Sequence, residues 1–311
     1  MIRILGTIFA GLLGLAFGSF LNVCLSRWPA GESIVHPRSH CRNCEHTLAW
    51  WENIPLLSWL ILRGRCRNCR TAISWRYPLV ELMVGVLWAI AAWQGFLQDP
   101  FTPSPLKYAL QGTHDLRIVR IIVVVAETAF TWCMVALAVL DAENLWLPNL
   151  LTIPGIILGF AFSVFGIYEA SWRGKIVWDC CIVPTFDRKL FLAFSLATVV
   201  SILAAASLIL IIRWLYKLIR HREGLGLGDA KLMALLAAWL GLPGALLAFA
   251  LGSILGALVA LALLAFPSAR ANPQSWATSK LPLGTFLCIG GIVSSLWGQP
   301  ILAAYMHWAG F

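Results

Sequence analysis

Long apolar runs separated by shorter polar segments make up most of the chain. An α-helix needs about twenty apolar residues to cross the hydrocarbon core of a bilayer. We count eight candidate spans, at residues 4–25, 78–97, 118–140, 151–168, 191–213, 230–243, 244–266 and 281–298. The sixth is short, and the run at 230–266 makes two crossings only if Leu242-Pro243-Gly244 breaks it tightly, so seven spans is the alternative. The pattern predicts an all-α polytopic membrane protein with about eight transmembrane helices.

One longer polar segment, residues 26–77, interrupts this pattern and is large enough to fold as a separate unit. We therefore expect a first transmembrane helix at 1–25, a small polar domain at 26–77 and a transmembrane domain at 78–311. Only Arg3 precedes the first apolar run, and no small-residue cleavage signature follows it. This favours a retained anchor over a removed signal peptide.

Composition and charge support this reading and set the orientation. The 311 residues are 60 % apolar and 12 % charged, with a formal net charge of +9, far from the soluble average. Positive loops stay cytoplasmic, and residues 26–77 carry an excess of arginine over glutamate: Arg27, Arg38, Arg42, Arg63, Arg65, Arg67, Arg70 and Arg76 against Glu32, Glu45 and Glu52. The N-terminus is therefore expected outside. A nucleic-acid partner is not expected, because these arginines lie in a loop between spans.

Two cysteine pairs in this loop predict a metal site. Cys41-Arg42-Asn43-Cys44 and Cys66-Arg67-Asn68-Cys69 are separated by 21 residues, a spacing that lets two short turns offer four thiolates to one tetrahedral Zn²⁺. Disulfides are the alternative, but the cytoplasm keeps thiols reduced. Four sulfur ligands leave no open position, so the zinc of this cytoplasmic tetracysteine domain is expected to be structural. Nearby alternative ligands are His36, His40 and His46.

Two aspartates at span ends predict an acid–base pair. Asp229 follows the glycine-alternating run of residues 223–228, which includes Gly226 and Gly228, and Asp141 ends the run at 118–140. Counting crossings places both on the cytoplasmic side. A carboxylate at a membrane boundary is costly to hold unless it is used, and two neighbouring carboxylates can share one proton and activate water, as in aspartic proteases. The alternative is a pair of solvated interfacial aspartates.

These motifs together resemble the type IV prepilin leader peptidase and N-methyltransferase family, which also serves type II secretion. The segments that carry the resemblance are residues 18–23, the two cysteine pairs, residues 52–55, 76–81, Asp141 with 147–149, 223–232 with Lys231, and 282–286. The resemblance implies a multi-pass enzyme of the bacterial inner membrane. It would cleave a short basic leader from a prepilin or pseudopilin after a glycine, with Asp141 and Asp229 as catalytic residues. It would then methylate the new N-terminal amine using S-adenosylmethionine.

The residues for methyl transfer follow the family pattern less closely. The family has a Gly-Lys dipeptide before its third cysteine, and here Gly64-Arg65 stands there; arginine keeps the charge but changes its geometry. Glu81, about one turn inside a span, is a further candidate, with snorkelling to the interface as the alternative. Asn149 stands where many members have aspartate, and Thr285 where many have proline.

Two other functions compete with this interpretation. A presenilin-like intramembrane aspartyl protease shares Gly-x-Gly-Asp and would cleave without methylating, but the tetracysteine loop argues against it. A non-enzymatic membrane scaffold or cation pathway would use the two aspartates as ligands. Loss of cleavage on replacing Asp141 or Asp229 would separate the peptidases from the scaffold.

Overall fold

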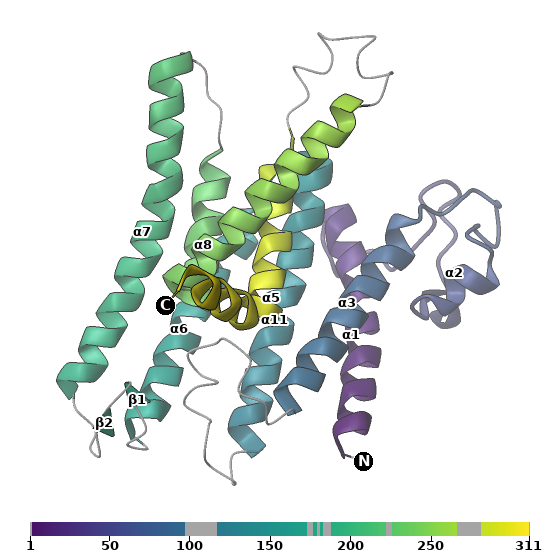
Figure 1. The fold of residues 1–311 in the computed structure, drawn as a ribbon. Helices are drawn as coiled ribbons and strands as arrows, with labels where there is room; N and C mark the ends of the chain where they lie inside the picture. The colour runs from purple at the N-terminus through teal and green to yellow at the C-terminus, as the bar shows by residue number, and fades with distance from the viewer. Residues whose placement is uncertain are drawn as a thin grey trace. The chain divides into compact units, whose positions relative to one another are not determined.

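The computed structural model is almost entirely helical (Figure 1), and it describes residues 2–96, 117–172, 177–178, 181–182, 188–221, 226–265 and 281–310. Its helices are α1 (Ile2–Arg27), the 3-10 helix η1 (Trp50–Asn53), α2 (Leu57–Ile61), α3 (Arg76–Phe96), α5 (Arg117–Asn144), α6 (Asn149–Trp172), α7 (Arg188–Arg220), α8 (Leu227–Ala265) and α11 (Leu283–Ala309). Residues 223–225 of the predicted glycine motif lie outside the described residues. Two short strands, β1 (Val177–Trp178) and β2 (Cys181–Ile182), pair antiparallel.

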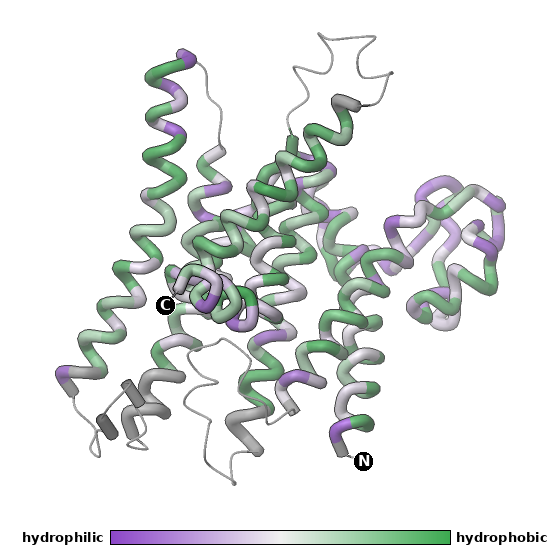
Figure 2. The backbone as a smooth tube through the Cα atoms, in the orientation of Figure 1, coloured by the Kyte–Doolittle hydropathy of each residue, from purple (hydrophilic) through white to green (hydrophobic). Residues whose placement is uncertain are grey.

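Six of the described helices are long and apolar enough to cross a membrane: Arg3–Arg27, Arg76–Gly95, Ile121–Asn144, Phe191–Arg220, Leu227–Leu263 and Leu283–Ala309. Asn149–Phe165 is a shorter apolar helix. Hydrophobic residues run along these helices, whereas hydrophilic residues concentrate between α1 and α3 (Figure 2). The all-α polytopic membrane class is confirmed. Each of the eight predicted spans has a helical counterpart, because α8 holds two of them on either side of a break and the shorter helix α6 holds the span at 151–168.

That element is α8, which contains both predicted spans 230–243 and 244–266. Gly241 has φ 71° and ψ 175°, outside the helical region, and Pro243 follows it. Glycine adopts a positive φ at little cost, and proline cannot donate an intrahelical hydrogen bond. The helix therefore turns sharply near the break expected at residues 242–244, as the course of α8 in Figure 1 shows.

The described residues form two compact units. The first contains the residues up to Phe96 together with Val124–Ala136 of α5; the second contains the remaining described residues. The predicted domain limits at residues 25 and 77 stay a prediction. In the first unit α1 packs against α3. A Cβ at Gly18 would lie 2.7 Å from the Glu81 Cα, so glycine permits this close approach. The side-chain N–H of Asn22 in α1 donates a hydrogen bond to the Tyr77 carbonyl of α3 (2.9 Å), which joins the two helices.

In the second unit α8 packs against α6, α7 and α11. Small residues allow transmembrane helices to approach closely, and a Cβ at Gly252 of α8 would meet the Phe286 carbonyl of α11 at 2.8 Å. Trp239 of α8 donates to the Gly155 carbonyl of α6 (2.8 Å). The C-terminal end of α5 belongs to the same unit as α8 and α11, so this unit carries both aspartates.

Candidate active site and metal centre

Asp141 lies in the last turn of α5 and is only 6 % exposed. Its Oδ2 accepts the backbone N–H of Thr285 at 2.7 Å and lies 3.2 Å from the Thr285 hydroxyl. Thr285 is the third residue of α11, whose N-cap residue, Pro282, offers no side-chain acceptor. The first N–H groups of a helix have no intrahelical partner and favour a negative group. The Asp141 carboxylate therefore caps a helix that begins more than 140 residues later.

Gly284 makes this contact possible. A Cβ at this position would lie 2.8 Å from Oδ2 and 2.9 Å from Cγ of Asp141. These distances are shorter than side-chain carbons tolerate, so the absence of a side chain lets the start of α11 lie directly against the carboxylate.

Asp229 is anchored in a similar way at the start of α8. It is 9 % exposed, and its Oδ2 accepts the N–H of Gly226 at 3.2 Å. Gly226 immediately precedes the helix and Asp229 is its third residue, so this bond is one half of a capping box. The two carboxylates are close enough to interact electrostatically. The second unit thus brings together two buried carboxylates, each tied by one oxygen to a helix N-terminus.

Two further contacts join the segment after Asp141 to the start of α8. Lys231 donates to Oδ1 of Asn149, the first residue of α6, at 2.7 Å. A Cβ at Gly228 would lie 3.1 Å from Leu147 Cδ1, so a side chain there would crowd this segment. Lys231 and Gly228, predicted as supporting residues, therefore hold the two aspartate-bearing segments together.

The four cysteines converge in the first unit. The Sγ atoms of Cys41, Cys44, Cys66 and Cys69 all lie within 4.8 Å of one another. Cys41 and Cys69 sulfurs are 3.8 Å apart, and those of Cys44 and Cys66 are 4.0 Å apart. A tetrahedral zinc with bonds of about 2.3 Å sets its sulfurs about 3.8 Å apart. The four thiols therefore fit a zinc ion.

The two cysteine turns repeat one backbone pattern. Cys41 N–H donates to the His46 carbonyl, and Cys66 N–H to the Thr71 carbonyl, both at 2.9 Å. The Thr71 hydroxyl lies 3.2 Å from the Cys69 sulfur. Hydrogen bonds from the Thr71 hydroxyl, the Thr71 backbone and Asn43 lower the pKa of that thiol, which favours the thiolate that binds metals. This pairing of identical Cys-Arg-Asn-Cys turns explains why the spacing alone predicts the cluster.

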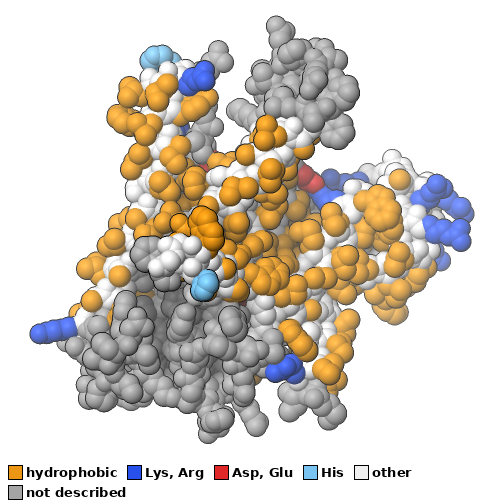
Figure 3. Space-filling view, viewed as in Figure 1, with side chains coloured by type: hydrophobic (Ala, Val, Ile, Leu, Met, Phe, Trp, Pro, Cys, Tyr) orange, Lys and Arg blue, Asp and Glu red, His pale blue; other side chains and the backbone are white. Residues whose placement is uncertain are grey.

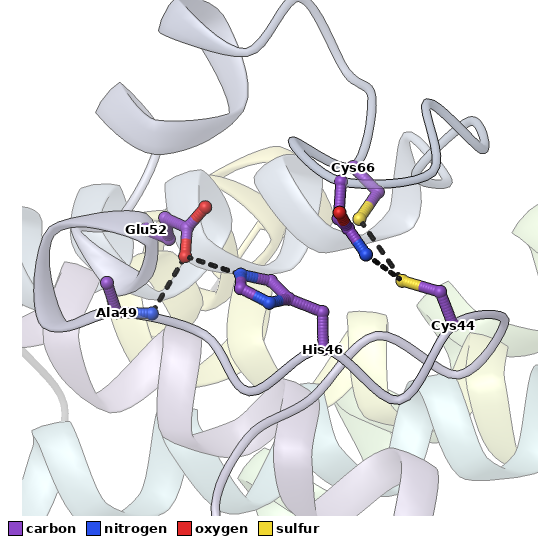
Figure 4. Close-up of polar contacts among 6 residues, drawn as sticks. Cys44, His46, Ala49, Glu52 and Cys66 are labelled. Carbon is purple, nitrogen blue, oxygen red and sulfur yellow. Dashed lines mark hydrogen bonds and ion pairs between the residues drawn. The ribbon is translucent and has the colours of Figure 1, made fainter.

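The histidine alternative finds no support among the described residues. His46 faces Glu52, with its Nε2 3.7 Å from Oε2, while Cys44 and Cys66 point toward each other (Figure 4). Glu52 is buried and also accepts the Ala49 N–H at 2.7 Å. His46 and Glu52 therefore shape the segment between the cysteine pairs.

The proposed methyl-transfer residues border the short helix α2. Glu81 is buried, and its Oε2 accepts the N–H of Leu56, just before α2, at 2.8 Å. Gly64 has φ 66°, and a Cβ there would lie 2.8 Å from the ring of Trp59 in α2. Arg65 is exposed. Both Glu81 and Gly64 thus position α2, and a role in methyl transfer stays a prediction for all three residues.

Thr285 and Gly284 are the site residues whose contact with Asp141 sequence reasoning missed. The motif at 282–286 marks them only as part of a resemblance, and the hydrogen bond joins residues 144 positions apart. The sequence indicates this contact only indirectly. A glycine and a hydroxyl residue stand in the first turn of the last apolar helix, where backbone N–H groups need acceptors.

Comparison with known proteins gives matches along most of the chain. Residues 12–95 match the model of the bacterial peptidase A24 N-terminal domain, and residues 128–261 match that of the type IV leader peptidase family. Three similar relatives are each named prepilin leader peptidase/N-methyltransferase. That of Pseudomonas putida is 33 % identical over 97 % of this chain and 94 % of its own length. That of Stutzerimonas stutzeri is 31 % identical over 96 % of this chain and 93 % of its own length. That of Myxococcus xanthus is 36 % identical over 89 % of this chain and 68 % of its own length. No solved structure gives a significant match.

Proposed function

Because this chain belongs to the type IV leader peptidase family, we propose that it is a membrane-embedded aspartic peptidase that also methylates its product. It removes the leader of a prepilin or pseudopilin and then transfers a methyl group to the new N-terminal amine. Support comes from relatives of this name that align with nearly the whole chain. The observation that carries the proposal is the pair of buried aspartates, each anchored through Oδ2 to a helix N-terminus.

Peptide hydrolysis by this pair follows from the chemistry of neighbouring carboxylates. Two carboxylates brought close around a substrate hold one proton between them. The ionised aspartate takes a proton from water, whose oxygen attacks the scissile carbonyl carbon, while the protonated aspartate donates to the carbonyl oxygen. Collapse of the tetrahedral intermediate breaks the C–N bond, and the amine leaves with a proton from the pair. The anchored oxygens keep both carboxylates oriented through these steps.

The proposed orientation puts the site at the cytoplasmic face of the bacterial inner membrane. Arginine side chains gather on the region between α1 and α3 (Figure 3), and loops rich in arginine stay cytoplasmic. Asp141 ends α5 and Asp229 begins α8, so both lie at helix ends. A leader on the cytoplasmic side of a membrane-inserted pilin would reach them there.

The two competing functions have less support. A presenilin-like protease has no tetracysteine domain, whereas residues 12–95 match the bacterial N-terminal domain of this peptidase family. A scaffold or cation pathway has no counterpart among the matches, since residues 128–261 match the type IV leader peptidase family.

Cys41, Cys44, Cys66 and Cys69 would hold a structural Zn²⁺. The sulfur spacing fits tetrahedral coordination, and four protein ligands leave no site for water or substrate. The segment between α1 and α3 has only short helices, η1 and α2, so metal binding would contribute much of its folding free energy.

Replacing Cys41 and Cys66 together by serine is expected to remove one bound zinc per chain, because it takes one ligand from each cysteine pair. Elemental analysis of the purified protein measures this. Cys133→Ala, which removes a thiol of α5 that is not in the cluster, is the control and should keep the metal. Full zinc occupancy in the double variant would contradict the assignment.

S-adenosylmethionine would supply the methyl group as an electrophilic sulfonium. Arg65 is exposed, and its guanidinium suits a carboxylate such as the one this donor carries. Glu81 and Gly64 support α2 beside it. We infer that Arg65 binds the donor while Glu81 and Gly64 hold the local backbone.

Arg65→Ala is therefore expected to lower methylation of a precleaved pilin peptide by about tenfold, the worth of a charge-assisted hydrogen bond, and to leave leader removal unchanged. Mass spectrometry of the peptide N-terminus reads both reactions. Arg38→Ala removes another exposed arginine of the same domain and should affect neither. Equal methylation by wild type and Arg65→Ala would exclude Arg65 from donor binding.

The proposed function as a whole is tested by incubating the purified protein in detergent with a synthetic prepilin peptide and no methyl donor. The expected product is the leaderless peptide with an unmodified amine. An intact peptide, with folded protein, would contradict the peptidase proposal.

A further inference from the structure

Thr285 offers two donors to one carboxylate oxygen. Its backbone N–H lies 2.7 Å from Oδ2 of Asp141 and its Oγ1 lies 3.2 Å from the same atom. The hydroxyl also lies 2.9 Å from the carbonyl of Ala138, one turn earlier in α5. Thr285 thus joins α11 to α5 at the residue on which the proposed chemistry depends.

We propose that Thr285 is a positioning residue of the peptidase reaction, which holds the Asp141 carboxylate in its reactive orientation through the hydroxyl as well as the backbone. The inference rests on the proposed function, since it assigns Asp141 a part in peptide cleavage.

An aspartate side chain is free to rotate unless its carboxylate is held. A carboxylate held by one hydrogen bond can still rotate about the axis of that bond. A second donor on the same oxygen, from a direction fixed by the Thr285 backbone, limits this rotation. Gly284 lies against the carboxylate and leaves little room for movement toward α11. Orientation of a reacting group within a few tenths of an ångström strongly affects rate.

The hydroxyl has one hydrogen and two acceptors within reach. When it donates to Asp141 it makes a charge-assisted bond, and when it donates to Ala138 it ties the two helices together. The hydroxyl holds the carboxylate directly only in the first arrangement; in the second it fixes Thr285, and the backbone N–H alone holds Oδ2. A valine of the same shape keeps the packing and the backbone N–H and loses only this hydroxyl.

Asp229 provides an internal contrast. Its anchor, the N–H of Gly226, lies three residues away at the start of its own helix and forms with that helix. The anchor of Asp141 is on a different helix and depends on packing between α5 and α11. Side-chain substitution at Thr285 therefore tests the orientation of one aspartate without touching the other.

The experiment measures leader removal by purified Thr285→Val, Thr285→Ala and Thr285→Ser under steady-state conditions. Thr285→Val and Thr285→Ala both lose the hydroxyl and are expected to lower kcat about tenfold, the usual effect of a lost hydrogen bond to a charged group. Their KM should be unchanged. Thr285→Ser keeps the hydroxyl and should restore kcat to within about twofold of wild type. Thr198→Val is the matched control, because within the described part of the chain the Thr198 hydroxyl bonds only to the Phe194 carbonyl of its own helix. Its kcat should equal that of wild type.

The proposal would be overturned by a wild-type kcat in both Thr285→Val and Thr285→Ala, or by an equally large loss of kcat in Thr285→Ser. An effect on KM alone would overturn it as well. Asp141→Asn is run in parallel to separate this outcome from failure of the proposed function. An inactive Asp141→Asn with fully active Thr285→Val rejects only the role of Thr285. Cleavage by Asp141→Asn would reject the proposed function itself.

Discussion

Asp141→Asn and Asp229→Asn are each expected to lower leader removal by about three orders of magnitude or more, because general acid–base catalysis by one group contributes 10²–10⁴-fold. An amide cannot take a proton from water or hold the shared proton of the pair. Loss of either carboxylate therefore removes the acid–base function of both. Cleavage of a prepilin peptide by the purified variants, followed by mass spectrometry, measures the effect.

Both variants should stay folded, since asparagine keeps an acceptor for each anchoring bond. The amide oxygen can accept the Thr285 N–H at position 141 and the Gly226 N–H at position 229. Glu143→Gln is the matched control: it neutralises an exposed carboxylate two residues from Asp141 and should leave cleavage unchanged. Near-wild-type cleavage by either asparagine variant would exclude the pair as the catalytic site.

Gly284→Ala is expected to reduce leader removal by about 10²-fold, the effect of displacing a reacting group by about 1 Å. The new Cβ would lie 2.8 Å from Oδ2 of Asp141, so the carboxylate or the start of α11 has to move. Thermal stability should fall little, because alanine is a better helix former than glycine by about 1 kcal/mol. Steady-state cleavage and a melting curve of the same preparation measure the two effects.

Gly11→Ala is the control for that substitution. Gly11 also lies within a helix, and a Cβ there would make an ordinary 3.4 Å contact with Ala89. It should leave activity unchanged. Full activity in Gly284→Ala would show that the carboxylate does not need the close approach of α11.

The fold was predictable from the sequence wherever a local pattern determines the structure. Apolar runs of about twenty residues predicted the long helices, because the bilayer fixes their length. The break near residues 242–244 was expected from proline and glycine, and the structure has it at Gly241. The sequence left one or two crossings open for residues 230–266, because a kink inside a continuous apolar run leaves no polar gap.

The candidate metal centre was predictable for a similar reason. Each Cys-x-x-Cys turn is a local structure, and only the contact between the two turns depends on the tertiary fold. The surroundings of Asp141 were not predictable in this way. Which N–H groups reach its carboxylate depends on the packing of α11 against α5, between residues 144 positions apart.

Glu81 has a structural partner that the sequence could not indicate. A carboxylate inside an apolar run suggested chemistry, and the structure gives it a partner in the N–H of Leu56. That bond ties the start of α2 to α3, a positioning contact that no pattern within either segment could indicate. A part in methyl transfer stays a prediction.

The most direct test of the whole account is a time course on one synthetic prepilin peptide with purified protein and S-adenosylmethionine, read by mass spectrometry. The account predicts that the leaderless peptide forms first and its methylated form second. With Asp141→Asn or Asp229→Asn neither product should form, although a precleaved peptide should still be methylated. An intact leader with the wild-type protein, or leader removal by either variant, would contradict it.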